Sequence, residues 1–194
     1  MDAPRITTAT SEDRERVLSA IVMGFSSDPL IRWFWPEANQ YLAAAGLVFD
    51  AVGGGAIDAG TAFVTEGFEG AALWLPPGVT SNEEAIMACM EATASADIIK
   101  EIVQVFEEID KYHPEEDIWY LPLIAIDPVH QGRGFGSALM KEALLRCDEA
   151  GLPAYLESSN PRNISIYERH GFEVMGEVQV GSSPVVTPML RPAR

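Results

Sequence analysis

The sequence predicts a single α/β domain that spans the whole chain, residues 1–194. That length is sufficient for one well-filled core and short for two independent domains. Apolar residues make up 47% of the chain and charged residues 22%, a balance that is typical of globular proteins and excludes a disordered chain. Segments with the alternating pattern of strands and segments with the helical pattern both recur along the chain.

The first half predicts one short strand, several helices and a strand pair. A strand over residues 5–9 precedes a helix whose start, Thr10–Asp13, supplies capping and acidic side chains. Ser26–Pro29 end that helix. The further elements that we expect in this half are helices over residues 37–50, 82–91 and 96–112, and strands over residues 61–66 and 71–75 joined by a tight turn.

A short aromatic segment, residues 30–35, follows the first helix and contains Trp33 and Trp35. Large apolar side chains beside a loop suit two roles equally well. They can form a helical turn that packs in the core, or an apolar wall of a substrate pocket. Both interpretations stay open at the level of sequence.

The last third predicts a central strand over residues 118–126, because this run is nearly continuously apolar and rich in strand-forming residues. Pro122 lacks an N–H group and suits a bulge in that strand, although an ordinary irregularity is the alternative. The elements expected after it are a helix over residues 134–150, a strand over 154–158, a short helix over 163–169 and a closing antiparallel pair over 172–180 and 185–191.

Glycines spaced by two residues, Gly132, Gly134 and Gly136, lie between the central strand and the next helix. Without side chains in the way, the backbone N–H groups can approach a bulky anion at a helix N-terminus. Arg133 adds a positive charge, so the segment predicts a pyrophosphate-binding loop. A Walker loop is excluded because no Gly-Lys-Ser/Thr follows. A dinucleotide site, with Glu157 near the ribose position, is less favoured because fewer than forty residues remain after it.

These residues resemble the GCN5-related N-acetyltransferase (GNAT) superfamily, whose signature is Gln/Arg-x-x-Gly-x-Gly/Ala after a central strand. Gln131, Gly134 and Gly136 fill that signature. A second family element runs over residues 155–172 and includes Asn160-Pro161-Arg162-Asn163 and Tyr167-Glu168-Arg169-His170-Gly171-Phe172. Within the superfamily the chain is similar to puromycin N-acetyltransferase-like members, strongly over about residues 112–180 and faintly before them.

The resemblance implies a mixed, mostly antiparallel sheet with helices on both faces and splayed central strands. It also implies acetyl-CoA as cosubstrate, with a substrate-side half of about residues 1–117 and a cofactor-binding half of about residues 118–194. The residues that it implies for the cofactor are Ile124, Ala125 and Ile126 along the pantetheine arm, Gln131, Gly132, Arg133, Gly134, Phe135, Gly136 and Ser137 around the pyrophosphate, and Asn160 and Asn163. Asn163 can instead cap the short helix.

Direct acetyl transfer to a bound amine is the mechanism that the resemblance implies. Tyr167 would act as general acid on the departing thiolate, and Glu157 is a candidate base for the protonated amine. A backbone N–H at Ala125 or Ile126 would stabilise the oxyanion. No covalent enzyme intermediate is expected, because neither cysteine has an activating partner in the sequence, and no metal is expected from three scattered histidines.

The formal net charge of −16 disfavours nucleic acid and anionic membranes as partners. This negative charge favours a cationic amine as substrate, unless the charge serves only to keep the protein soluble. We therefore expect a primary amine on a small molecule as acceptor, in a cytoplasmic monomer or homodimer without a signal peptide. The alternatives are a non-catalytic acyl-CoA-binding module, a protein N-acetyltransferase, and an enzyme that transfers a larger acyl group.

Overall fold

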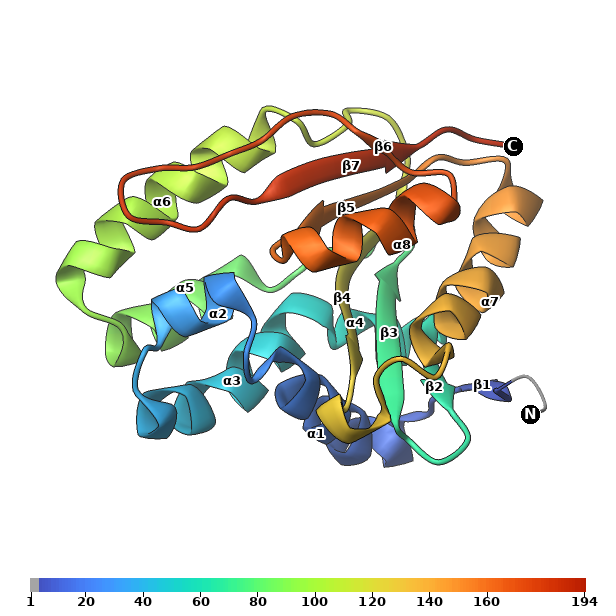
Figure 1. Cartoon of the computed structure of the whole chain (residues 1–194), viewed down its shortest axis with the longest axis horizontal. Helices are drawn as coiled ribbons and strands as arrows, with labels where there is room; N and C mark the ends of the chain where they lie inside the picture. Colours follow the sequence, from blue (N-terminus) through green and yellow to red (C-terminus); the bar gives the residue numbers. More distant parts are fainter. Residues whose placement is uncertain (1–3) are drawn as a thin grey trace.

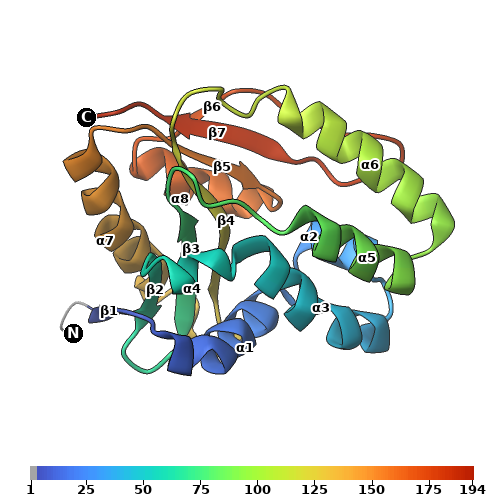
Figure 2. The ribbon, with the colours of Figure 1, turned by 180° about the vertical axis from the view of Figure 1, so that it is seen from behind.

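In the computed structural model, which describes residues 4–194, seven strands form one sheet in the order β1-β2-β3-β4-β5-β7-β6 (Figure 1). Every neighbouring pair is antiparallel except β4 and β5, which are parallel. Helices α1 and α3 pack on one face of the sheet and α7 on the other (Figure 2). The predicted fold class, a mixed and mostly antiparallel sheet with helices on both faces, is confirmed.

The strands are β1 Ile6–Thr8, β2 Ala62–Thr65, β3 Gly70–Leu75, β4 Trp119–Ile126, β5 Ala154–Ser158, β6 Glu173–Val174 and β7 Thr187–Arg191. The helices are α1 Arg14–Phe25, α2 Pro29–Phe34, α3 Ala38–Gly53, α4 Gly55–Asp58, α5 Glu83–Thr93, α6 Ala96–Asp110, α7 Phe135–Ala150 and α8 Ile164–Arg169. Three short 3₁₀ helices are η1 Ser11–Asp13, η2 Pro128–His130 and η3 Pro161–Asn163. The expected elements are therefore present, with boundaries that differ by a few residues.

A β-bulge divides the central strand β4. Leu123 pairs with Leu73 of β3, but Leu75 pairs with Tyr120, so β4 contains one extra residue next to Pro122. Because side chains alternate across a strand, one extra residue reverses which face they reach. Trp119 and Leu121 accordingly pack with α7, whereas Leu123 and Ala125 pack with α1 and α3. The bulge predicted at Pro122 is confirmed.

The predicted splay of the central strands is also present. Strand β4 pairs with β5 only at Trp119↔Ala154 and Tyr120↔Tyr155, and the ladder then stops. From Leu121 to Ile126, β4 keeps β3 as its strand partner on one edge and has none on the other among the described residues. This edge is an open template for hydrogen bonds with a ligand backbone.

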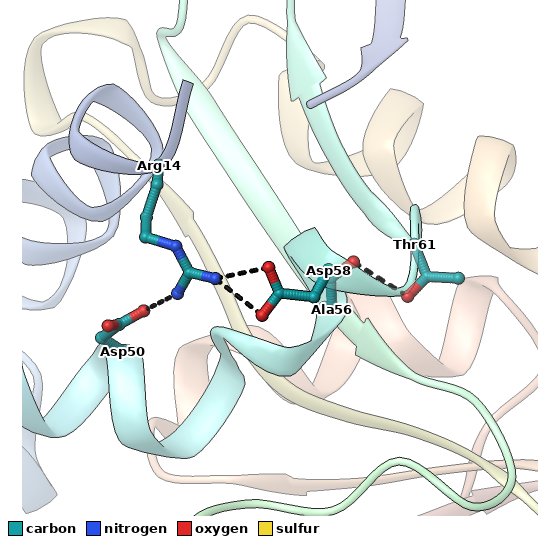
Figure 3. A network of polar contacts seen from close by, with 5 residues as sticks. All are labelled: Arg14, Asp50, Ala56, Asp58 and Thr61. Carbon is teal, nitrogen blue, oxygen red and sulfur yellow. Dashed lines mark hydrogen bonds and ion pairs between the residues drawn. The ribbon is translucent and has the colours of Figure 1, made fainter. Parts of the chain in front are cut away.

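A polar network fixes the first helix against the end of α3 (Figure 3). The Arg14 guanidinium bonds Asp50 and also donates twice to Asp58, with both Nη2–Oδ distances at 2.8 Å. The Thr61 hydroxyl donates to the carbonyl of Ala56 at 3.2 Å, which closes the turn between α4 and β2. Arg14 therefore joins α1, α3 and α4 into one layer.

Two sequence expectations need correction. The helix predicted over residues 37–50 is longer than expected, because α3 runs through Gly53 and α4 begins at Gly55. The closing pair predicted over residues 172–180 and 185–191 shortens to β6, β7 and a single bridge between Val178 and Val186. Between them the backbone at Gly176 passes so close to Tyr112 that a Cβ there would lie 2.5 Å from its hydroxyl. Packing against this side chain replaces the expected strand pairing.

Candidate active site

The glycine loop that follows β4 presents unpaired amides. Gly132 and Gly134 have φ angles of 75° and 85°, a left-handed conformation that glycine adopts without strain. Among the described residues, no backbone or side-chain acceptor bonds the N–H groups of residues 132–137. They precede and open the sixteen-residue helix α7. Unpaired amides at a helix N-terminus form a site for a phosphate group.

Side chains anchor this loop to the sheet and to α8. The Gln131 amide Nε2 donates to the carbonyl of Ile126 at 3.1 Å, which holds the loop at the end of β4. The Ser137 hydroxyl lies 2.9 Å from His170 Nε2, a hydrogen bond that joins α7 to the end of α8. Of the predicted pyrophosphate-binding residues, Gln131 and Ser137 thus have structural partners, whereas the glycines leave space for a ligand.

A partly buried acid–phenol pair lies where β4 and β5 separate. The Tyr120 hydroxyl donates to Glu157 Oε2 at 2.7 Å. Burial raises the pKa of Glu157 to about 7, and the hydrogen bond from Tyr120 opposes that rise. A carboxyl group with a pKa near neutrality can exchange a proton at physiological pH, as a general base requires. Tyr120 was not identified from the sequence, because its partner lies 37 residues away on another strand.

Two further rings enclose this pair. The His113 ring packs edge-on against Tyr120 and Tyr155, with centroid distances of 5.4 and 4.9 Å. Burial lowers the pKa of His113, which favours the neutral imidazole. The Tyr155 hydroxyl is fully buried and has no hydrogen-bond partner among the described residues. The structure therefore places His113 against both tyrosine rings of this site.

Tyr167 on α8 is buried, with 6% of its surface exposed, and packs with the cluster on the α7 side of the sheet. Its burial raises the pKa of the phenol well above its usual value, and the charge of Asp28 raises this pKa further. Tyr167 therefore stays protonated and able to donate. Asp28 belongs to the loop between α1 and α2, and its hydrogen bond with Ser159 at 2.7 Å joins this loop to the turn after β5.

Asp28, which the sequence predicts only as part of the turn that ends α1, lies in the candidate site. Its Oδ1 accepts from the amides of Leu30 and Ile31, at 3.0 and 3.2 Å, and caps α2. Its Oδ2 accepts from the Ser159 hydroxyl at 2.7 Å. Burial raises the pKa of Asp28, and these hydrogen bonds oppose the rise. The Asp-Pro pair marks an N-cap in the sequence, but nothing local indicates a partner 131 residues away.

The remaining predicted residues differ in their surroundings. The Asn160 side chain accepts from the amide of Arg162 at 3.1 Å and opens η3. Asn163 precedes α8 without capping it, so the predicted alternative as a helix cap is wrong. Trp35 is fully buried and donates to Thr93 at 2.9 Å, which places it in the core rather than on a pocket wall. Trp33 is partly buried and donates to Ser182 at 3.0 Å.

Comparison with known proteins indicates a family for the central and C-terminal part of the chain. Residues 86–174 match the acetyltransferase (GNAT) domain family. The matched segment, a little under half of the chain, is similar to a GNAT acetyltransferase domain. An uncharacterised N-acetyltransferase of Schizosaccharomyces pombe is 24% identical over 176 residues, which cover 84% of this chain and 71% of that protein. A mycothiol acetyltransferase of Propionibacterium freudenreichii is 36% identical over 75 residues, which cover 37% of this chain and 22% of that protein.

Solved structures show the same GNAT fold. A Corynebacterium glutamicum protein described as a histone acetyltransferase HPA2 and related acetyltransferase superposes with a TM-score of 0.71 at 23% identity, covering 100% of this chain and 98% of that one. Arylalkylamine N-acetyltransferase 2 of Aedes aegypti superposes with a TM-score of 0.67 at 12% identity, covering both chains fully, 100% each. The matched family and the Schizosaccharomyces pombe relative support an acyltransferase of the acetyl-CoA-dependent N-acetyltransferase type.

The residues present fit acetyl-CoA as the cosubstrate of this GNAT domain. A Cβ added at Gly132 or Gly134 would meet no atom within 4 Å, so the loop surface is open to a ligand. Residues 4–194 contain no group of three His, Cys, Asp or Glu side chains that could hold a metal ion. In the same part of the chain, every helix is too short or too polar to cross a bilayer.

Proposed function

We propose that this GNAT domain transfers the acetyl group of acetyl-CoA to a primary amine of a small molecule by direct attack of the bound amine. The observation that carries the proposal is the open edge of β4. It begins beside Tyr120 and Glu157 and ends at the unpaired amides of the glycine loop. A ligand that is extended at one end and carries phosphates at the other matches this arrangement.

The cosubstrate would lie along β4 and the glycine loop. Ile124, Ala125 and Ile126 would bond the pantetheine arm through their backbone, and residues 131–137 would hold the pyrophosphate. Asn160 and Asn163 would contact the arm from the turn after β5. When bound, acetyl-CoA supplies the activated acyl group, so the protein's own contribution is to orient the two substrates and move protons.

Glu157 would take the proton from the amine, directly or through a water molecule, because its raised pKa matches neutral pH. Tyr167 would donate a proton to the departing sulfur, because its burial keeps the phenol protonated. A backbone N–H at Ala125 or Ile126 would stabilise the negative charge that develops on the acyl oxygen. Asp28 would position the N-terminus of α2 at the site by accepting a hydrogen bond from the Ser159 hydroxyl.

The acceptor class rests on charge and on the aromatic segment. The net charge of −16 attracts cations, and Trp33 lies partly exposed on α2, whose N-terminus is capped by Asp28. A cation with an apolar portion would use both features. Several solved relatives are described as arylalkylamine and polyamine N-acetyltransferases, which supports an amine acceptor. An aminonucleoside acceptor would agree with the similarity to puromycin N-acetyltransferase-like proteins.

The test measures acetyl-CoA binding by titration calorimetry and acetylation of an amine panel, for the wild type and Tyr167→Phe. We expect both proteins to bind acetyl-CoA alike and the variant to lose about 10²–10⁴-fold in turnover, the usual contribution of a general acid. Wild-type binding without turnover of any amine would support a sensing module instead. Turnover of a peptide amine in preference to small amines would support a protein N-acetyltransferase, and preference for a longer acyl-CoA would support a larger acyl group.

A further inference from the structure

Two phenols and one carboxyl group lie together where β4 and β5 diverge (Figure 1). Tyr120 and Tyr155 are the last residues that pair between these strands, and their ring centroids are 5.9 Å apart. Glu157 follows Tyr155 by two residues on β5, so the two side chains point to the same face of the sheet. The register of the sheet therefore brings both phenols beside the carboxyl group of Glu157.

No basic side chain balances the charge of this carboxyl group. Within residues 4–194, no Lys, Arg or His nitrogen lies within 4.0 Å of the Glu157 oxygens. Burial lowers the pKa of His113, although the charge of Asp110 opposes this change, so the imidazole above the phenols is neutral at pH 7. A partly buried carboxylate needs either a cation or hydrogen-bond donors. The side chains that can supply donors here are Tyr120 and Tyr155.

The two phenols differ in their present hydrogen bonds. The Tyr120 hydroxyl donates to Glu157 Oε2 at 2.7 Å. The Tyr155 hydroxyl is buried and has no hydrogen-bond partner in the described part of the chain, a rare and unfavourable state for a hydroxyl group. Burial raises the pKa of Tyr155, and the charges of Glu157 and Asp110 raise it further. Tyr155 therefore stays protonated near the carboxylate, with a donor that is not yet used.

We propose that Tyr120 and Tyr155 are positioning residues that together hold the ionised carboxylate of Glu157. Tyr120 keeps its hydrogen bond, and the Tyr155 hydroxyl donates a second one when Glu157 loses its proton. The inference rests on the proposed function, because it takes Glu157 as the base. A carboxylate offers about four lone-pair sites, so two phenols leave room for the amine or for a bridging water molecule.

Phenols suit this task better than a basic side chain would. A lysine or arginine beside Glu157 would also stabilise its charged form, but it would repel the ammonium group of an arriving acceptor. A neutral phenol stabilises the carboxylate by a hydrogen bond and adds no positive charge. The pair would therefore keep the base ionised near neutral pH and leave the site attractive to a cation.

Carbon-13 NMR of the Glu157 carboxyl group, assigned by the signal that Glu157→Gln removes, measures its ionisation directly. We expect Tyr120→Phe and Tyr155→Phe each to raise the pH of half-ionisation by about one unit, because each removes a donor to the charged form. The double variant should raise it further. The midpoint of the acidic limb of kcat/KM should move by the same amount in each variant.

Tyr112→Phe is the matched control, because Tyr112 is a half-buried tyrosine whose hydroxyl lies against the backbone at Gly176. It should change neither the half-ionisation of Glu157 nor the midpoint of the kcat/KM profile. A role of Tyr120 and Tyr155 in packing alone predicts a different result, namely a lower kcat/KM at every pH with an unchanged midpoint.

An unchanged pH of half-ionisation in both single variants would overturn the proposal, and an unchanged value in Tyr155→Phe alone would overturn the second hydrogen bond. If the ionisation of Glu157 shifts while the acidic limb of kcat/KM stays in place, the phenols hold the carboxylate as proposed. In that case the role of Glu157 as the base fails instead, so the two failures are distinguishable.

Discussion

Glu157 combines partial burial, a phenol donor and a position beside the open edge of β4, and these properties make its titration observable. If it acts as the base, kcat/KM should fall as the pH drops through about 7, since the protonated acid cannot accept a proton. Glu157→Gln should lower kcat/KM by about 10²–10⁴-fold and remove this dependence. A pH profile of both proteins provides the measurement, and an unchanged acidic limb in the variant would exclude Glu157 as its source.

The same raised pKa predicts a pH-dependent effect on stability. The folded state binds the Glu157 proton more tightly than the unfolded chain, so this group favours folding at low pH and loses that contribution as the pH rises through about 7. Glu157→Gln keeps an acceptor for Tyr120 without the charge. It should therefore stabilise the fold at pH 8 more than at pH 5, as urea unfolding at the two values can show. An equal effect at both would contradict the titration.

Asp28 connects residues that only the fold brings together. Asp28→Ala removes the cap of α2 and the partner of Ser159, and should cost about 1–2 kcal/mol of unfolding free energy. Asp28→Asn is the matched control, because its side-chain carbonyl still caps the helix, and it should cost less. Urea unfolding of both variants measures the difference. Equal costs would show that the cap contributes little.

At the scale of single residues, the sequence identifies those site residues whose role depends only on their neighbours in the chain. Gly132, Gly134 and Gln131 form one continuous segment, so their role follows from spacing and from the helix behind them. Tyr120 and Asp28 could not be identified this way, because each becomes a site residue only through a partner 37 or 131 residues away. Trp33 and Trp35 were indistinguishable in sequence, and their different burial depends on how α2 packs.

At the scale of helices and strands, the contact between α1 and β4 positions the open edge of β4. A Cβ at Gly24 would lie 2.4 Å from the Ala125 side chain and 3.1 Å from the Ile126 amide. Gly24→Ala should therefore displace β4, cost about 1–3 kcal/mol and weaken acetyl-CoA binding. Gly46→Ala is the opposite case, because its Cβ would meet no atom within 4 Å on helix α3, and it should stabilise by up to about 1 kcal/mol. Unfolding and calorimetry on both variants check this contrast.

At the scale of helices and strands, the sequence predicts a feature correctly where a single residue type determines the backbone conformation. Pro122 indicated the bulge, because proline cannot donate to the ladder, and the register shift beside it confirms this. The exchange of faces that follows along β4 was not predicted, because the alternation of Trp119, Leu121, Leu123 and Ala125 reads as one continuous buried face. The length of the closing strand pair was overestimated, because the alternation of apolar residues in these strands does not reveal that Gly176 lies against Tyr112.

Over the whole molecule, the charge is large but unevenly placed. The chain has 29 acidic and 13 basic residues, yet four of the basic ones line one hollow between α7, the end of α8 and the end of β7, namely Lys141, Arg169, Arg191 and Arg194. Composition alone predicts repulsion of every anion, including an anionic cosubstrate. The fold gathers these four basic residues by bringing α7, α8 and β7 together, which no count of residues could show.

The remaining acidic surface leads to a prediction about the acceptor. An excess of sixteen negative charges should steer a cationic amine toward the protein, over a range that screening shortens from about 30 Å at 0.01 M salt to about 8 Å at 0.15 M. We expect kcat/KM for such an amine to fall severalfold across this interval. An amine that is neutral at the assay pH is the control and should show little change, at saturating acetyl-CoA in both cases. If the two amines respond alike, the acidic surface serves solubility rather than substrate capture, and the preference for a cation must come from side chains inside the site.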